Sequence, residues 1–356
     1  MSSSEYESFM RACFSLAAKG YNKVKSNPLV GCVIVCQNKI IASGYHQEYG
    51  KAHAEINALS QLKDKSVLPH CTLYVNLEPC SHYGKTPPCA DSIIQHKILK
   101  VVISNTDPFD KVSGKGIAKL QQAGITVIQN ILKNEGEYIN RAFFTFVTEK
   151  RPYVTLKWAE SADGFISPLY PKKFLISGVE THLHTQKLRA YSDAILIGKN
   201  TLWADNPKLT VREIKEAENP VRVIVSTNVV TPENAFLWQN NAKTWYLYPA
   251  AHGNFSPFNK NFEYVPLKST NIPSVLDFLY EKGVKSLLIE GGAEILKQCI
   301  AQNLYDEVWI YKSKNVTFKE GIKAPELQEN MNLFQETETN YMYHYSKVPL
   351  YKAFWE

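Results

Sequence analysis

The sequence predicts an α/β protein made of two successive domains. The length of 356 residues exceeds the usual size of one domain, which is about 150 residues. Apolar strand patterns alternate with amphipathic helix patterns, and this alternation is typical of a layered α/β sheet. The alternation stops at a charged helical connector, residues 130–152, and then starts again. We therefore expect one domain over residues 1–148 and a second over residues 149–356.

The elements of the first half follow from the period of their apolar residues. Phe9, Ala12, Cys13 and Leu16 form a helical stripe, and the continuous apolar run 29–36 predicts a buried strand. The later elements are expected in the order strand 39–45, helix 53–62, strand 71–77, helix 88–96, strand 100–105, helix 114–124 and strand 125–128. Strands and helices thus alternate through most of the first half.

The second half repeats this alternation beyond Pro152. Its expected elements are strand 153–161, helix 180–191, strand 193–198, strand 221–227, helix 274–283, a strand that turns through Gly291 and Gly292 into a helix within 286–300, and strand 307–313. A glycine turn between a strand and a helix can hold a phosphate, but many such connections need glycine for geometry alone. The full G-x-G-x-x-G fingerprint is absent.

Composition narrows the class of protein. The net charge of +6 is spread along the chain without a block of five or six like charges, so we expect no nucleic-acid arm. No apolar run approaches the roughly 18 residues of a membrane span, and the N-terminus does not resemble a signal peptide. We expect a cytoplasmic protein in a reducing compartment. Its seven cysteines are then metal ligands, catalytic groups or core residues.

One histidine and two cysteines have the pattern of a metal site. His53 opens a helix in "HAE", while Cys80 and Cys89 flank the loop after the next strand. Three protein ligands are typical of a catalytic zinc, whose fourth position is left for water. The alternative is a closed structural zinc site with a fourth ligand from His82 or Cys71.

Glu55 follows His53 by two residues on the first helical turn. A carboxylate there can carry a proton from a zinc-activated water to a leaving amine. The alternative is that Glu55 only complements the positive end of the helix dipole.

These motifs resemble a known family. "HAE" followed by "PC" and a later cysteine is similar to the signature of the zinc-dependent cytidine deaminase superfamily. The long form "EPCSHYGKTPPCADSI", with "NPLVGCVIV" before it and "DPFDKVSGKG" after it, resembles the deaminase half of the bifunctional riboflavin biosynthesis enzymes. "RPYVTLKWAESADG" and "LRAYSDAILIGKNTLWADNPKLTVR" resemble the reductase half of the same family.

The resemblance implies a fold for each half. Residues 1–148 would form a cytidine-deaminase-like three-layer α/β/α domain. One zinc would be bound there by His53, Cys80 and Cys89, and Glu55 would shuttle protons. Residues 149–356 would form a dihydrofolate-reductase-like α/β domain that uses NADPH.

The resemblance also implies contacts with the ligands. Asn27 and the loop 81–88 would line the pyrimidine pocket, although Asn27 could instead belong to an Asn-Pro turn. His82 and Lys85 would contact the substrate or serve only solubility. The implied cofactor contacts are Thr201, Asp205, Thr227 and Gly292. The implied substrate contacts in the reductase half are Lys157, Arg189, Leu209, Arg212 and Glu290.

One segment departs from the family pattern. Residues 167–178 read "SPLYPKKFLISG", and the position of a tryptophan in the family falls on Phe174 or Leu175. No cofactor contact is transferred to that position. The resemblance implies that Arg189 contacts the sugar phosphate, since a planar guanidinium pairs with phosphate oxygens in two parallel hydrogen bonds; the alternative is that Arg189 belongs to a solvated helix face.

The implied activity is a pair of consecutive steps in riboflavin synthesis. The substrate would be 2,5-diamino-6-(ribosylamino)pyrimidin-4-one 5'-phosphate, which is deaminated and then reduced from ribosyl to ribityl. The expected partners are this small molecule and further copies of the chain, without nucleic acid or membrane. Two alternatives stay open: a nucleic-acid base deaminase, and a second domain that senses NADPH or another ligand without turnover.

Overall fold

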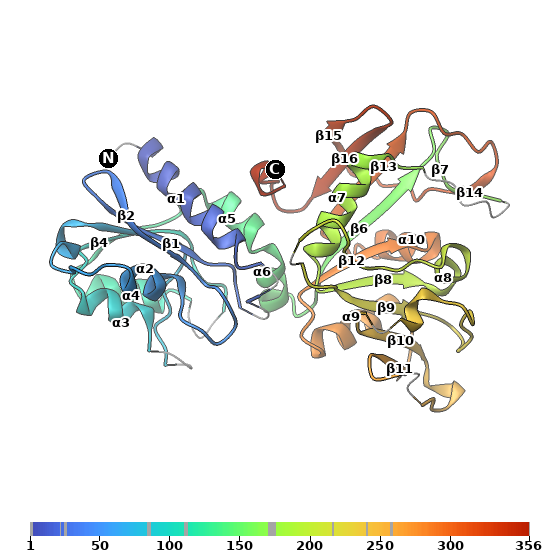
Figure 1. Ribbon diagram of the computed structural model, residues 1–356, viewed down its shortest axis with the longest axis horizontal. Coiled ribbons are helices and arrows are strands. Elements are labelled where there is room, and N and C mark those ends of the chain that lie inside the picture. Colours follow the sequence, from blue (N-terminus) through green and yellow to red (C-terminus); the bar gives the residue numbers. More distant parts are fainter. Residues whose placement is uncertain are drawn as a thin grey trace. The chain divides into compact units, whose positions relative to one another are not determined.

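The computed structural model divides the chain into two units (Figure 1), Met1–Lys150 together with Val348–Glu356, and Arg151–Lys347. The residues that the structure describes are 3–21, 23–24, 27–83, 87–109, 113–169, 176–215, 217–239, 241–256 and 259–355. Lys85, Phe174 and Leu175, which the sequence had singled out, lie outside these ranges. Within them, no helix is both long and apolar enough to cross a membrane.

Unit 1 contains a five-stranded sheet in the order β2-β1-β3-β4-β5. Strand β1 pairs antiparallel with β2 and β3, whereas β3, β4 and β5 run parallel. The strands are β1 (Gly31–Cys36), β2 (Lys39–Tyr45), β3 (Thr72–Leu77), β4 (Lys100–Asn105) and β5 (Thr126–Ile128). Because β3 and β4 are parallel neighbours, the loops after them emerge at the same edge of the sheet.

Helices cover both faces of this sheet, as the three-layer expectation required. Cys32 and Ile34 of β1 pack with α2, α3 and α4, while Val33 and Val35 pack with α1 and α5. The helices are α1 (Ser3–Ala18), α2 (Ala54–Ser60), α3 (Cys89–Gln95), α4 (Lys115–Gln122), α5 (Lys133–Ile139) and α6 (Arg141–Thr148). Alternate side chains of β1 therefore pack into two separate apolar layers, one on each face of the sheet.

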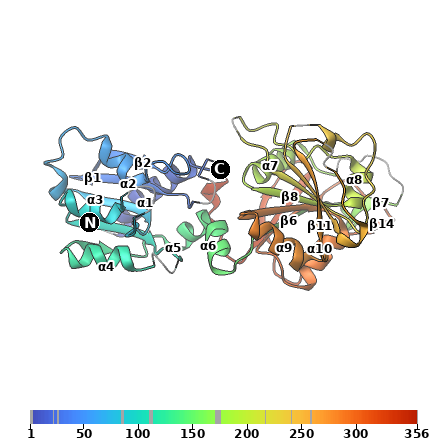
Figure 2. The same ribbon diagram turned by 90° about the horizontal axis from the view of Figure 1, so that it is seen from below.

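Unit 2 contains a nine-stranded sheet in the order β11-β10-β9-β8-β12-β6-β13-β16-β15, and Figure 2 shows it from a second direction. The strands from β11 to β13 in this order are parallel, and β16 and β15 are added antiparallel. The strands are β6 (Tyr153–Glu160), β8 (Ala194–Gly198), β9 (Val221–Val225), β10 (Thr244–Pro249), β11 (Phe262–Leu267), β12 (Ser286–Gly291), β13 (Glu307–Ser313), β15 (Asn332–Glu336) and β16 (Asn340–Ser346). A two-stranded sheet pairs β7 (Phe165–Pro168) with β14 (Gly321–Lys323).

The helices of unit 2 bury opposite faces of this sheet. On one face, α9 and α10 supply Val275, Leu279, Leu296 and Cys299 to the largest core cluster. On the other face, His184 of α7 packs on Trp309 of β13. The helices are α7 (Val179–Ala190), α8 (Lys199–Asp205), α9 (Ile272–Glu281) and α10 (Ala293–Ala301).

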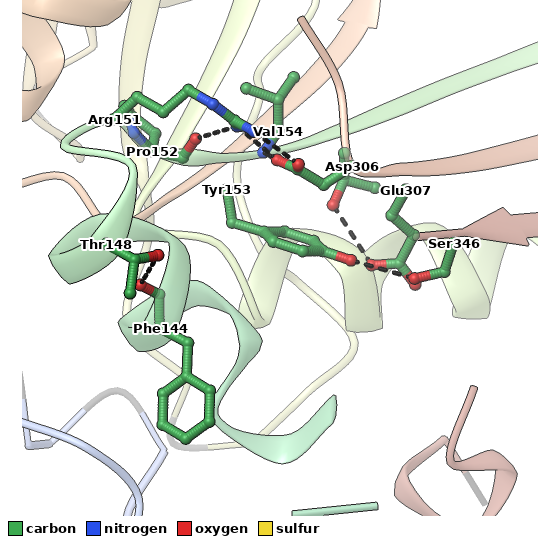
Figure 3. A network of polar contacts seen from close by, with 10 residues as sticks. Phe144, Thr148, Arg151, Pro152, Tyr153, Val154, Asp306, Glu307 and Ser346 are labelled. Atoms are coloured by element: carbon green, nitrogen blue, oxygen red, sulfur yellow. Dashed lines mark hydrogen bonds and ion pairs between the residues drawn. The ribbon is translucent and has the colours of Figure 1, made fainter. Parts of the chain in front are cut away.

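A buried ion pair fixes the start of unit 2 (Figure 3). The two terminal nitrogens of Arg151 donate to the Asp306 carboxylate at 2.6 and 2.7 Å, and Asp306 Oδ2 also accepts from the Val154 amide at 2.8 Å. Losing one partner of such a pair leaves an uncompensated buried charge, which costs about 3–5 kcal/mol. Residue 151 is therefore anchored at the point where the second sheet begins.

The end of the chain differs from the expected range 149–356. Residues 348–356 belong to unit 1, where Trp355 Nε1 donates to the Tyr138 hydroxyl at 2.7 Å and Tyr351 packs on Phe14. The cause is a run of aromatic side chains after the last strand of unit 2. Tyr351 and Phe354 pack, partly buried, against the core that α1 and α5 share, and Trp355 is buried. The sequence pattern of alternating strands and helices carried no signal for this return.

Candidate functional site

Three elements of unit 1 bring the expected metal ligands together. His53 is the N-cap of α2, Cys80 follows the end of β3, and Cys89 is the first residue of α3. The Nδ1 atom of His53 lies 3.5 Å from Cys80 Sγ and 3.3 Å from Cys89 Sγ. The three donor atoms all lie within 4.8 Å of one another. One imidazole and two thiolates at this separation fit zinc.

The closed structural site is not what the described residues form. Cys71 precedes β3 and Cys80 follows it, so a six-residue strand of roughly 20 Å separates them. Within the described part of the chain, the cluster of His, Cys, Asp and Glu that could hold a metal consists of His53, Cys80 and Cys89, without His82. Three protein ligands leave a fourth position for water, as in a catalytic site.

Contacts within this cluster shift the pKa values of Cys80 and His53. Hydrogen bonds from Cys89 and from His53 lower the pKa of the Cys80 thiol to about 4, although burial opposes them. The same interaction with Cys80 raises the pKa of His53. One thiolate is thus stabilised before any metal arrives, and a thiolate is the form that binds zinc.

Glu55 has a buried carboxylate that the protein itself does not saturate. The residue is 3% exposed, and its Oε2 atom has no hydrogen-bond partner among the described residues. Burial raises the pKa of Glu55 above its usual range. Glu55 lines the same cavity as His53 and Cys80, which favours a role in proton transfer over one that only complements the helix dipole.

That cavity has a volume of about 410 Å³, within the range of small-molecule sites. Asn27 lies in its wall, where its Nδ2 atom is 2.9 Å from His46 Nε2. The other ring nitrogen of His46 lies 3.1 Å from the Ala52 carbonyl. If the Nδ1–H group of His46 donates to this carbonyl, its Nε2 atom is left to accept a hydrogen bond from the Asn27 side-chain amide. This hydrogen bond holds Asn27 in one orientation. His46 has no distinctive motif around it, and the sequence reasoning missed it.

The sequence reasoning also missed Asp107 and Glu78. Asp107 follows β4, lines the cavity and has its pKa raised to about 6, chiefly by burial. Glu78 accepts hydrogen bonds from the amides of Asp107, Gly114, Gly116 and Ile117 at 2.8–3.2 Å. The "DP" dipeptide directly after a predicted strand was the available signal for Asp107, since polar residues at strand ends gather at one edge.

In unit 2 the structure joins two of the expected substrate residues. Arg189 Nε and Nη2 donate to the two oxygens of Glu290 at 2.6 and 2.7 Å, and the two side chains are largely buried, with 11% and 8% of their surface exposed. Burial raises the pKa of Glu290, but the charge and hydrogen bonds of Arg189 outweigh it, so the net pKa is lowered. Arg189 Nη1 also donates to the Thr210 carbonyl at 3.2 Å. The fork expected to pair with phosphate is therefore directed at a carboxylate.

The loop after α8 carries the other expected substrate contacts. Leu209 is buried with a φ of +51°, a conformation uncommon for leucine and typical of functional loops. The amide of Arg212 donates to Gln186 of α7 at 2.9 Å, and the Arg212 side chain is exposed. Helix α7 thus holds this loop beside Arg189.

Lys157 lies on β6 beside the Arg189–Glu290 pair. Burial lowers its pKa, and Glu290 opposes this effect. Its Nζ atom stands 4.9 Å from the centroid of the Tyr311 ring, whose hydroxyl is 2.6 Å from His184 Nδ1. The sequence reasoning identified Lys157 but not Tyr311 or His184.

The expected cofactor residues lie in the segments that follow three neighbouring parallel strands, β8, β9 and β12. Gly292 follows β12 with a φ of +89°, and a methyl group on Gly291 would stand 3.3 Å from Thr201 Oγ1 of α8. Asp205 ends α8, and Thr227 follows β9, which pairs with β8. Glycine is needed here both for the backbone conformation and for the close approach. Ligands of open α/β sheets bind at the carboxyl ends of such strands.

Comparison with known families identifies both halves. The family described as "Cytidine and deoxycytidylate deaminase zinc-binding region" matches residues 3–105. The family described as "RibD C-terminal domain" matches residues 152–313.

Similar proteins extend the match over most of the chain. The "Riboflavin biosynthesis protein RibD" of Aquifex aeolicus is 35% identical over 323 residues, which cover 90% of each protein. That of Bacillus amyloliquefaciens is 37% identical over 311 residues, 86% of this chain and 83% of the relative.

Solved structures agree with these relatives. A diaminohydroxyphosphoribosylaminopyrimidine deaminase/5-amino-6-(5-phosphoribosylamino)uracil reductase from Thermotoga maritima has a TM-score of 0.87 and 32% identity, covering 96% of this chain and 98% of its own. RibD from Acinetobacter baumannii, form 1, has a TM-score of 0.84 and 28% identity, covering 96% and 99%.

Proposed function

The chain belongs to the RibD family of riboflavin biosynthesis proteins, and from this premise we propose which of its residues perform each reaction. It is a bifunctional enzyme, a zinc-dependent pyrimidine deaminase and an NADPH-dependent reductase. The substrate is 2,5-diamino-6-(ribosylamino)pyrimidin-4-one 5'-phosphate. Unit 1 is proposed to deaminate it, and residues 151–347 are proposed to reduce the product.

In unit 1, His53, Cys80 and Cys89 are proposed to hold the zinc. When bound, zinc lowers the pKa of water to near 7 and so provides a nucleophile at neutral pH. Glu55 takes a proton from the attacking water and returns it to the leaving amine. The ring carbon gains the oxygen of water and loses its amino group as ammonia.

Asn27 and His46 orient the ring in this scheme. The amide of Asn27 offers one donor group and one acceptor atom, which suits the polar edge of a pyrimidine. His46 fixes the amide because their side chains are 2.9 Å apart. Asp107, in the loop after β4, lines the same cavity.

In unit 2, Thr201, Asp205, Thr227 and Gly292 are proposed to bind the cofactor. NADPH supplies the hydride for C1' of the opened ribosyl group. Lys157 stands beside Glu290 and, with a lowered pKa, is suited to give a proton to the sugar oxygen.

The remaining site residues in unit 2 are proposed to be Glu290, Leu209 and Arg212 beside the substrate, and Arg189, which acts through Glu290. Arg189 keeps Glu290 ionised and in place, while Leu209 fixes the turn of the loop. Arg212 presents an exposed guanidinium to the sugar phosphate. We also propose that the protein is a cytoplasmic homo-oligomer. Sedimentation of the purified protein would test the oligomeric state, and fractionation of cells would test the location.

The observation that carries this proposal is the joint placement of three zinc-type ligands and an unpartnered buried carboxylate oxygen in one cavity. The test is incubation of the purified, zinc-loaded protein with the diaminopyrimidine phosphate, with and without NADPH. Ammonia should form in both samples, and nicotinamide absorbance should fall only after ammonia has formed. Absence of ammonia would overturn the deaminase assignment, and ammonia without NADPH oxidation would leave only unit 1 as an enzyme.

The role of Glu55 has its own test. Glu55→Gln should retain one zinc per chain and lower the deamination rate by about 10²–10⁴-fold, the usual contribution of general acid–base catalysis. NADPH oxidation with the deaminated product should stay at the wild-type rate. Loss of zinc would mean that Glu55 is a ligand or a structural support instead.

A further inference from the structure

The last residues of the chain pack as part of the deaminase unit. We name residues 348–356 the C-terminal strap; all but residue 356 are described. Trp355 is 4% exposed, and its indole N–H donates to the Tyr138 hydroxyl at 2.7 Å. Phe354 packs edge-on against the Tyr138 ring, with 6.0 Å between the ring centroids, and Tyr351 packs on Phe14 of α1 at 5.8 Å.

The strap covers the joint between α5 and α6. Tyr138 is fully buried on α5, and Arg141 is the first residue of α6. The Arg141 guanidinium stacks 4.1 Å from the Tyr138 ring centroid and also lies 5.3 Å from Phe354 and 5.8 Å from Trp355. Arg141 Nη1 donates to the Tyr138 carbonyl at 2.8 Å. One cation is thus enclosed by three rings, two of which the strap supplies.

The joint itself holds the segment that carries Asn27. Asn140 stands between the two helices, and its side chain accepts from the Leu29 amide at 2.8 Å and donates to the Leu29 carbonyl at 2.9 Å. Asn140 is buried, so both bonds are protected from competing water. Asn27 and Pro28, the residues just before Leu29, line the deaminase cavity.

The joint also sets the direction of α6. Phe143, Phe146 and Val147 of this helix line the same cavity. The side chains of α6 are mostly half-buried, so α6 has little core of its own to fix its direction. Displacement of the joint would therefore move two separate walls of the cavity, one through Asn140 and one through α6.

We propose that the C-terminal strap is a positioning element of the deaminase site, and that Trp355 acts through Tyr138 and Asn140 to hold Asn27 in the substrate cavity. Because the chain reaches the strap only after β16, unit 1 is complete only when unit 2 has been synthesised. The proposal rests on the proposed deaminase function, but the placement of Leu29 can be measured without turnover.

The test compares Trp355→Ala, Trp355→Phe and the control Ala353→Gln, an exposed position in the same strap. Trp355→Ala should raise the KM for deamination about tenfold, with kcat within about twofold, since a loss near 1.4 kcal/mol is tenfold in affinity. Trp355→Phe keeps a ring but loses the donor, and should show an intermediate KM. Zinc content and NADPH oxidation with the deaminated product should match the wild type in all three.

Hydrogen exchange provides the readout that does not depend on activity. The Leu29 amide should exchange faster in Trp355→Ala, while the Ile103 amide in β4 keeps its wild-type protection. An unchanged KM together with an unchanged Leu29 exchange rate would overturn the proposal. If Trp355→Ala loses zinc or fails to fold, Trp355→Phe decides by the same two measurements. If the wild-type protein releases no ammonia, the proposed function is refuted instead. The exchange rate of the Leu29 amide would then still show whether the strap positions this segment.

Discussion

A substitution at Glu78 is the clearest test of how the loop after β4 is held beside the proposed zinc ligands. Its carboxylate accepts four backbone N–H groups, Oε2 from Asp107 and Gly114 and Oε1 from Gly116 and Ile117. Glu78 is only 4% exposed, so water cannot replace these bonds. In Glu78→Gln one oxygen becomes an NH₂ group, which cannot accept and faces two of the donors.

The magnitude follows from the number of bonds lost. A hydrogen bond to a charged group contributes about 1.5–3 kcal/mol, so losing two costs about 3 kcal/mol or more. This energy corresponds to roughly 100-fold faster exchange of the affected amides, because 1.4 kcal/mol is about a factor of ten. The KM for deamination should also rise, since Asp107 lines the cavity and loses its anchor.

The assay is hydrogen exchange resolved at Gly114 and Gly116. The matched control is Glu7→Gln on α1, a half-exposed glutamate that pairs with Arg11 of the same helix. Glu7→Gln should leave both exchange rates and the KM unchanged. If exchange at Gly114 and Gly116 changes by less than about threefold in Glu78→Gln, the four bonds do not hold the loop and the reasoning is wrong.

Three further predictions concern the Arg189–Glu290 ion pair and the titration of His184 and Cys80. Arg189→Met should lower the free energy of unfolding by about 3–5 kcal/mol, because it leaves the Glu290 carboxylate buried without its partner. The double variant Arg189→Met, Glu290→Gln should recover part of the lost melting temperature. A single variant as stable as the wild type would contradict this prediction. Burial lowers the pKa of His184 from 6.5 to about 3, so below pH 6.5 the unfolded chain binds a proton that the folded chain does not. Stability should then be complete above pH 6.5 and fall by about 1.4 kcal/mol per pH unit towards pH 3, and His184→Gln should flatten the melting temperature over that range. After zinc is removed with a chelator, iodoacetamide at pH 6 should alkylate Cys80 before Cys89, because hydrogen bonds from Cys89 and His53 lower the pKa of Cys80 to about 4; peptide mass analysis showing Cys89 first would refute it.

The clustering of the three proposed zinc ligands could be predicted from sequence because their geometry is local. His53 caps a helix, and Cys80 and Cys89 flank one loop, so their spacing along the chain carries most of the information. The positions of the main strands and helices were also predictable, since the apolar periods of buried strands and amphipathic helices differ. The strands β10, β11, β15 and β16 were not predicted. The two edge strands, β11 and β15, include exposed positions that weaken the period, whereas β10 and β16 contain none.

Contacts between distant residues could not be predicted in this way. Arg189 and Glu290 are 101 residues apart, and nothing in either motif indicates that they pair. The contact between Trp355 and Tyr138 spans 217 residues and joins the end of the chain to a helix of unit 1. Such pairs follow from the strand order and from packing, which a single sequence does not state.

The Arg189–Glu290 pair changes the assignment of the phosphate. A phosphate bound by the Arg189 fork would have to displace two charged hydrogen bonds at 2.6 and 2.7 Å and leave Glu290 as an uncompensated buried carboxylate. The side chain of Arg212 is exposed, and its charge also helps to lower the pKa of Glu290, so the two groups are near each other. We therefore infer that Arg212 meets the phosphate at the mouth of the site, while Arg189 holds Glu290 ionised behind it. Buried charge then orders the catalytic groups, and exposed charge captures the anion.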